Sequence, residues 1–212
     1  MKITIVYDNT TEIPGLLADW GWSCLVEKQD RKILFDTGGN GKILLENMLA
    51  LNIDPTSIDD VVISHSDFDH IGGLSTFLNA NPTAVVHIPI SFRGIHYPNQ
   101  VKYYNSPTEI YSGFFLSGEL DKREQSLAVK TEKGLVLVVG CGHPGVGKIM
   151  ESFSQFGDIC SIVGGLHGFK EFELLTNIEK ICPSHCTVHK ARIKQLHPEK
   201  YLEGGVGEVF LL

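Results

Sequence analysis

The stretch Ser64-His65-Ser66-Asp67-Phe68-Asp69-His70 places four side chains of metal-binding type, His65, Asp67, Asp69 and His70, within six positions. It directly follows the strand-like run 61–63, and Gly72-Gly73 then opens a predicted helix over 74–79. Alternate side chains of an extended segment point to one side, while the adjacent Asp69 and His70 can reach a second point nearby. The spacing therefore indicates a site for two metal ions close together. The alternative is an acidic, histidine-containing surface turn.

Three further histidines lie at the ends of strand-like runs. His143, His167 and His185 each follow small residues, in the sequences GCGH, GGLH and PSH. Taken singly, each is typical of an ordinary hydrogen-bonded histidine. Sheet proteins commonly place their sites just after strands, so together with the cluster at 65–70 these histidines could complete a dinuclear centre.

The rest of the chain is divided into short strand-like and helix-like stretches. We expect strands over 2–7, 23–27, 31–35, 61–63, 84–88, 127–131, 135–139 and 159–163, and a short strand with a loop over 181–187. We expect helices over 42–51, 74–79, 146–156, 171–180 and 191–196. Residues 89–119 show neither period, and we expect an irregular, aromatic-rich loop there. Strand pairs early and strand–helix alternation later predict mixed sheets with helices packed outside.

Length and charge limit the class of protein. The 212 residues show no repeat or linker, so we expect one domain over 1–212. The net charge of −7 argues against a nucleic-acid partner held by general attraction to phosphate. No apolar run reaches the roughly 18 residues of a membrane helix, and polar residues follow Met1 too soon for a signal peptide. We expect a cytoplasmic protein with a small-molecule substrate and no nucleic-acid or membrane partner.

These motifs resemble the metallo-β-lactamase superfamily of metal-dependent hydrolases. The resemblance covers most of the chain and rests on Asp36 in FDTGG, the stretch SHSDFDHIGGL over 64–74, and then His143, His167 and His185, in the family's order. The phrases VYDNT, ILFDTGG, GCGHPG and PSHCT resemble one branch, which includes archaeal methanopterin-pathway dihydropteroate-like synthases and many uncharacterised hydrolases. The resemblance implies an α/β fold, a four-layer αββα sandwich with a dinuclear metal site at one sheet edge.

The resemblance also implies a ligand set. The first ion would take His65, Asp67 and His143; the second would take Asp69, His70 and His185. Asp36 would orient these ligands without binding metal. Two positions depart from the family pattern: Asp67 stands where histidine is usual, and His167 stands where many members place a bridging carboxylate. We keep His167 as a candidate ligand.

Two divalent ions are expected, zinc first, with manganese or iron favoured more than usual because the carboxylate of Asp67 is a harder ligand than imidazole. One weakly held ion is the alternative. Such a centre lowers the pKa of bound water toward about 7 and supports hydrolysis of an ester or phosphoester. Asp69 is expected to orient the water, and His167, if it is not a ligand, to hydrogen-bond the developing oxyanion.

Other functions stay open at this point. The branch resemblance alone implies a transferase that joins a dihydropterin to an aminobenzoate-ribose phosphate, with Arg93 as a phosphate anchor. A di-iron redox protein and a metal-free binding module are further alternatives. The aromatic loop around Arg93 could line a substrate pocket or pack on the core or on a second subunit of a homo-oligomer.

Five cysteines are scattered along the chain, an odd count that does not suggest a disulfide framework. Cys141 and Cys186 each lie close in sequence to a candidate ligand, and thiolate binds zinc well. We favour both as buried neighbours of the site rather than ligands, because free cysteine is usually a small core residue.

Overall fold

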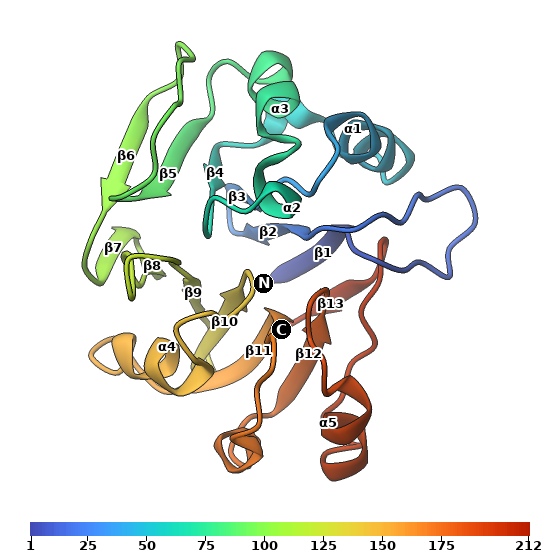
Figure 1. Cartoon of the computed structure of the whole chain (residues 1–212), viewed down its shortest axis with the longest axis vertical. Coiled ribbons are helices and arrows are strands. Elements are labelled where there is room, and N and C mark those ends of the chain that lie inside the picture. Colours follow the sequence, from blue (N-terminus) through green and yellow to red (C-terminus); the bar gives the residue numbers. More distant parts are fainter.

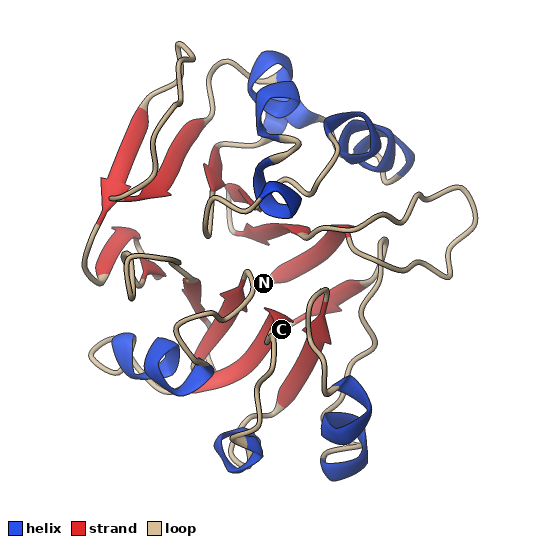
Figure 2. Cartoon of the chain, viewed as in Figure 1, coloured by secondary structure: helices blue, strands red, loops and turns tan.

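The computed structural model describes residues 1–212 and contains two β-sheets packed face to face, with helices outside them (Figure 1; Figure 2). Sheet A has the order β13 (Val209–Leu211), β1 (Lys2–Tyr7), β2 (Ser23–Lys28), β3 (Arg31–Phe35), β4 (Asp60–Val62), β5 (Val85–Pro89) and β6 (Val101–Tyr104). Sheet B has the order β12 (Lys180–Ser184), β11 (Ile159–Gly165), β10 (Leu135–Val139), β9 (Leu127–Lys130), β8 (Phe114–Leu116) and β7 (Thr108–Tyr111). The four-layer αββα sandwich is confirmed.

Helices cover the outer face of each sheet. The helices α1 (Gly41–Ala50), α2 (Phe68–Ile71) and α3 (Leu74–Ala80), with the 3-10 turn η1 (Pro55–Ser57), belong to the half formed by sheet A. The helices α4 (Val146–Ser152) and α5 (Lys190–Leu196), with the 3-10 turn η2 (Phe172–Leu175), belong to the half formed by sheet B. These two groups of helices lie on opposite sides of the sandwich in Figure 1.

Alternation along the strands assigns side chains to these layers. In β3, Ile33 and Phe35 lie in the core between the sheets, whereas Leu34 packs outward with the α1 and α3 residues. In β10, Val136 and Val138 lie between the sheets, and the intervening residues pack outward under the helices of the other half. The period of two places successive side chains on opposite faces, so each strand contributes to two apolar layers.

The carboxyl ends of parallel strands from both sheets meet at one edge of the sandwich. The strands β3, β4 and β5 run parallel, as do β10, β11 and β12. The residues that follow these ends include Asp36, His65, His143, His167 and His185. Asp36, His167 and His185 adopt left-handed backbone angles, with φ of 55°, 44° and 47°, which turn the chain sharply at the strand end. Non-glycine residues with such angles concentrate at functional sites.

The segment 89–119 is not the irregular loop that we expected. It contains β6, β7 and β8, and β6 to β7 is the point where the chain passes from sheet A to sheet B. These strands have only three or four residues each, and proline and glycine lie in the turns between them. A period of two is not recognisable over so few residues.

One further expectation fails, and two short elements were not predicted. The predicted helix over 171–180 is only the single turn η2, followed by the start of β12 at Lys180. Its apolar residues pack into the apolar layer between sheet B and the helices that cover it. Their spacing therefore resembles that of a helix. The strand β13 and the one-turn helix α2 were not predicted, and both are too short for periodicity to reveal. No helix of the structure has the length and apolar character needed to cross a membrane.

Candidate metal centre

Four histidines at this edge share one arrangement. In each ring Nδ1 is hydrogen-bonded to an oxygen of the protein: His65 to Ser64 Oγ at 2.8 Å, His70 to Asp36 Oδ2 at 2.7 Å, His143 to Glu124 Oε2 at 2.8 Å, and His185 to Asn9 Oδ1 at 3.0 Å. Carboxylate and amide oxygens only accept, and Ser64 Oγ already donates to Asp36, so Nδ1 carries the proton. Each Nε2 then presents a lone pair, the arrangement typical of metal-binding histidines.

These lone pairs gather with two carboxylates into two clusters. The ligand atoms of His65, Asp67 and His143 lie within 4.8 Å of one another. Those of Asp69, His70 and His185 lie within the same limit. The rings of His65 and His70 adjoin, with centroids 4.1 Å apart, so the two clusters are neighbours. They are the two trios implied by the family resemblance.

The donor atoms fit a metal in their chemistry. Nε2 of His65 and Nε2 of His185 are buried and have no hydrogen-bond partner. Burial lowers the pKa of His65 to about 2 and that of His185 to about 4, with the neighbouring His70 adding to both shifts. Both rings are therefore neutral at pH 7, the form that binds a metal. Neutral imidazole and carboxylate together suit divalent zinc, manganese or iron.

Asp36 links the two trios through hydrogen bonds. Its carboxylate is fully buried and accepts hydrogen bonds from the Ser64 amide at 2.7 Å, from Ser64 Oγ at 2.6 Å and from His70. Since Ser64 Oγ in turn accepts from His65, one carboxylate fixes a histidine of each trio. Burial raises the pKa of Asp36, against the opposing effect of His70 and Ser64. Burial also disfavours the His70 cation, but the Asp36 carboxylate outweighs it and raises the pKa of His70.

Glu124 orients the ring of His143, as Asp36 orients that of His70. This role of Glu124 was not predicted from the sequence. Its buried carboxylate accepts the amides of Cys141 and Gly142 at 2.9 Å each and that of His143 at 3.0 Å, besides His143 Nδ1. Burial alone would raise its pKa, but the hydrogen bonds from the His143 ring and from the backbone amides lower the pKa of Glu124 to about 2. A single glutamate in the sequence DKREQS carries no recognisable signal of this role.

Asn9 and Asp8 hold His185 in the same manner. Asn9 accepts from the ring of His185 and donates to its carbonyl oxygen at 3.1 Å. Asp8 accepts the His185 amide at 3.1 Å. Both lie in the phrase VYDNT, which is one of the phrases that carry the family resemblance. Trp20, whose side chain is exposed, lies 5.0 Å from the His185 ring, measured between centroids, and forms an apolar wall beside this trio.

Asp67 faces an arginine as well as the histidines. Its Oδ2 lies 3.3 Å from His65 Nε2 and 4.0 Å from His143 Nε2, and Arg123 donates to the same oxygen at 2.6 Å. Arg123 was also missed from the sequence. Arg123 and Arg93 line a pocket of about 90 Å³ together with His65 and Ser66. Two guanidinium groups therefore border the first trio on one side.

The structure places the remaining predicted residues at the rim. The Arg93 guanidinium is exposed and donates to the carbonyl oxygens of Ile90 and Phe92, so its own loop holds it. His167 is exposed and belongs to neither trio; its ring centroid lies 5.0 Å from that of His143. His167 and His143 border a second pocket, of about 340 Å³, which Lys170 also lines. Asp69 Oδ2 lies 3.2 Å from His185 Nε2.

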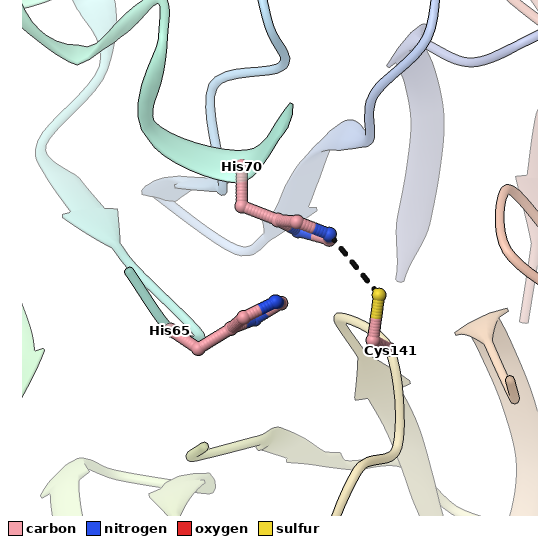
Figure 3. A group of neighbouring side chains, drawn as sticks. All are labelled: His65, His70 and Cys141. Atoms are coloured by element: carbon pink, nitrogen blue, oxygen red, sulfur yellow. Dashed lines mark hydrogen bonds between the residues drawn. The ribbon is translucent and has the colours of Figure 1, made fainter. Parts of the chain in front are cut away.

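Two thiols lie against the histidines. Cys141 Sγ lies 3.2 Å from His70 Nε2, as the dashed line in Figure 3 marks. Cys186 Sγ lies 3.8 Å from the Cys141 carbonyl oxygen, and the ligand atoms of Cys141, His185 and Cys186 fall within 4.8 Å of one another. The hydrogen bond between the thiols lowers the pKa of Cys186, aided by His167, and together with burial raises the pKa of Cys141.

Comparisons with known proteins agree with this description. Residues 21–152 match the family model of the Metallo-beta-lactamase superfamily. A 7,8-dihydropterin-6-methyl-4-(beta-D-ribofuranosyl)-aminobenzene-5'-phosphate synthase of Methanocaldococcus jannaschii is 25% identical over 81% of this chain and 82% of its own length. An uncharacterised protein of the same organism is 25% identical over 98% of both chains. The crystal structure of Tm1679, a metal-dependent hydrolase of the beta-lactamase superfamily, superposes with a TM-score of 0.81 at 24% identity and covers 100% of this chain and 99% of its own.

Proposed function

Because the chain belongs to the metallo-beta-lactamase superfamily, we propose that it is a metal-dependent hydrolase of a small-molecule ester or phosphoester. The observation that supports this most is the set of four histidines, each anchored through Nδ1 and each offering Nε2 to a cluster that contains a carboxylate. We assign one divalent ion to His65, Asp67 and His143 and a second to Asp69, His70 and His185.

Ions held there would supply a hydrolytic nucleophile at neutral pH and polarise the oxygen of the bond under attack. Asp69 uses one oxygen toward His185 and leaves the other to accept a proton from the attacking water. His167, exposed beside His143, donates a hydrogen bond to the oxyanion that develops on the substrate. Asp36 and Glu124 keep the rings of His70 and His143 oriented, with Nδ1 bonded to the carboxylate and Nε2 facing the ion.

The pockets on either side of the trios indicate a small substrate. The smaller pocket, between Arg93 and Arg123, has the size and charge to take one phosphate or carboxylate group. The larger one, beside His143 and His167, is open to a more extended part of the molecule. We infer that an anionic group of the substrate enters between the two arginines.

A second candidate is the transferase reaction, and the synthase of Methanocaldococcus jannaschii is the observation that favours it. A substrate that carries a ribose phosphate would present its phosphate to the same pair of arginines. The two candidates differ in whether water or a second organic molecule attacks, so product analysis with and without a pterin acceptor distinguishes them.

The direct test is hydrolysis of p-nitrophenyl esters and phosphoesters by protein treated with a chelator and then reloaded with zinc or manganese. We expect activity only in the reloaded protein. Asp69→Asn should reduce it by roughly a hundredfold or more, whereas the exposed Asp30→Asn should not. Hydrolysis that survives the chelator unchanged would overturn the proposal.

A further inference from the structure

We propose that the thiolate of Cys141 is a protein ligand of the metal centre, placed between the two ions so that it can bridge them. The inference rests on the proposed two-metal site and adds a sulfur donor to it. The site would then hold a softer metal than its carboxylates alone select.

The position of the sulfur carries the inference. Cys141 follows β10, and its side chain is 4% exposed. The ligand atoms of His65, His70 and Cys141 lie within 4.8 Å of one another. His65 belongs to the first trio and His70 to the second, so Sγ faces both. In Figure 3 the three side chains approach one another, His65 and His70 from the stretch 64–70 and Cys141 from the loop after β10.

The separation of Sγ and His70 Nε2 suits a shared ion. A nitrogen at about 2.0 Å and a sulfur at about 2.3 Å on one tetrahedral zinc lie roughly 3.5 Å apart. The observed distance is 3.2 Å. His70 Nδ1 donates to Asp36, so the Nε2 lone pair points at the thiol. Without metal the thiol proton lies between the two atoms; on metal binding that proton leaves to solvent and the ion takes its place.

The loop that carries Cys141 is fixed on both sides. The amides of Cys141 and Gly142 both donate to the buried Glu124 carboxylate at 2.9 Å. Gly140 packs so closely that an added Cβ would lie 2.3 Å from Ser64 Oγ, and Gly142 has a φ of +74°. A side chain at either glycine would displace the loop or strain it. The sulfur is therefore held at the trios by the same residues that orient the histidines.

The family resemblance places a bridging carboxylate at the position of His167, but His167 is exposed and lies outside both trios. Cys141 Sγ contacts Nε2 of His70, in the second trio, and lies within 4.8 Å of the ligand atom of His65, in the first. Cys141 therefore takes the bridging position between the two trios. A thiolate also neutralises one of the positive charges of two divalent ions, as a carboxylate does, and it favours zinc or cobalt over manganese.

Cobalt substitution tests this on the full chain. Metal-free protein is loaded with Co²⁺, and bound cobalt and the near-ultraviolet sulfur-to-cobalt charge-transfer absorption are measured. We expect the absorption in the wild type and in Cys186→Ser, the neighbouring thiol, and its loss in Cys141→Ser with cobalt still bound. Bound cobalt without this absorption in the wild type, or an absorption that persists in Cys141→Ser or disappears only in Cys186→Ser, would overturn the proposal.

X-ray absorption at the zinc edge of the wild type needs no variant and covers the case in which Cys141→Ser does not fold. A Zn–S distance of about 2.3 Å supports the proposal, and a shell of nitrogen and oxygen alone contradicts it. A folded wild type that binds neither cobalt nor zinc would refute the proposed metal-dependent function itself, which is a different result.

Discussion

Asp36 Oδ2 lies 2.7 Å from Nδ1 of His70 and also accepts the hydroxyl of Ser64, which holds His65. One buried carboxylate thus sets the ring orientation and tautomer of a histidine in each trio. The two ion positions are coupled through this residue before any ion binds. Loss of Asp36 should therefore affect both positions rather than one.

The first prediction concerns Asp36→Asn. The amide NH2 faces either Ser64 Oγ and His70 Nδ1, which both bond to Oδ2, or the Ser64 amide, which bonds to Oδ1, so either orientation breaks contacts that hold the stretch 64–70. We expect affinity for both ions to fall roughly 10–100-fold, measured by competition with a chromophoric chelator. Asp30→Asn, on the exposed turn between β2 and β3, is the control. Loss of one ion only would contradict the shared role of Asp36.

Glu124→Gln should act on one position. The Glu124 carboxylate accepts three backbone amides and His143 Nδ1, and glutamine has one oxygen fewer to accept them. We expect the ion of the first trio to be lost and the free energy of unfolding to fall by about 1–3 kcal/mol. Metal-to-chain ratio and urea unfolding measure the two effects. The exposed Glu132→Gln should change neither, and an unchanged ratio in Glu124→Gln would refute this role.

The buried neutral histidines predict how the metal-free protein responds to acid. Folding lowers the pKa of His65 and His185 from 6.5 to about 2 and about 4, so below pH 6.5 the unfolded chain binds protons that the folded one does not. The free energy of unfolding should therefore fall between pH 6.5 and about 4, by about 1.4 kcal/mol per pH unit for each ring. His70, whose pKa is raised, is protonated in both states in this window and does not offset the loss.

Urea unfolding of metal-free protein across this pH range measures the slope. His185→Gln should reduce the pH dependence of the free energy of unfolding by the contribution of one ring. The exposed His96→Gln should leave it unchanged. A slope that is the same in His185→Gln and the wild type would show that His185 titrates normally when folded.

A buried hydrogen-bond network around Asp60 should affect the free energy of unfolding but not metal binding. Asp60 on β4 accepts from Tyr111 of β7 at 2.7 Å, from His87 at 2.8 Å and from Arg31 at 3.1 Å, and so joins the two sheets. Tyr111→Phe should cost about 0.5–1.5 kcal/mol of unfolding free energy and leave metal content unchanged. Tyr103→Phe, which is half exposed, is the control. A loss of metal in Tyr111→Phe would contradict this separation.

The arginine pair predicts a substrate preference. Arg123 is held by Asp67 and shares its pocket with Arg93. Arg123→Gln should raise KM for phosphate- or carboxylate-bearing substrates about 10–100-fold, because a charge-assisted hydrogen bond contributes about 1.5–3 kcal/mol. Neutral esters should keep their KM, and Arg123→Lys should recover part of the loss. An equal change for neutral and anionic substrates would exclude the pocket as an anion site.

The resemblance to a known family, carried by the cluster at 65–70 and the later histidines, implied the fold and the grouping of six residues that the structure brings together in two trios. Glu124, Asn9 and Arg123 could not be predicted in the same way. Each reaches the site from a turn distant in sequence, and its role depends on a hydrogen bond that only the packed sheets create. The strands β6 to β8 were missed for a related reason: they are defined by pairing with neighbouring strands of their own sheet rather than by a sequence pattern.

The metal-to-chain ratio of the purified full-length protein, measured by elemental analysis before and after reloading with zinc, tests the central claim most directly. The account predicts two ions per chain, falling to one in Glu124→Gln. No ion bound by a folded chain, even after reloading, would contradict it.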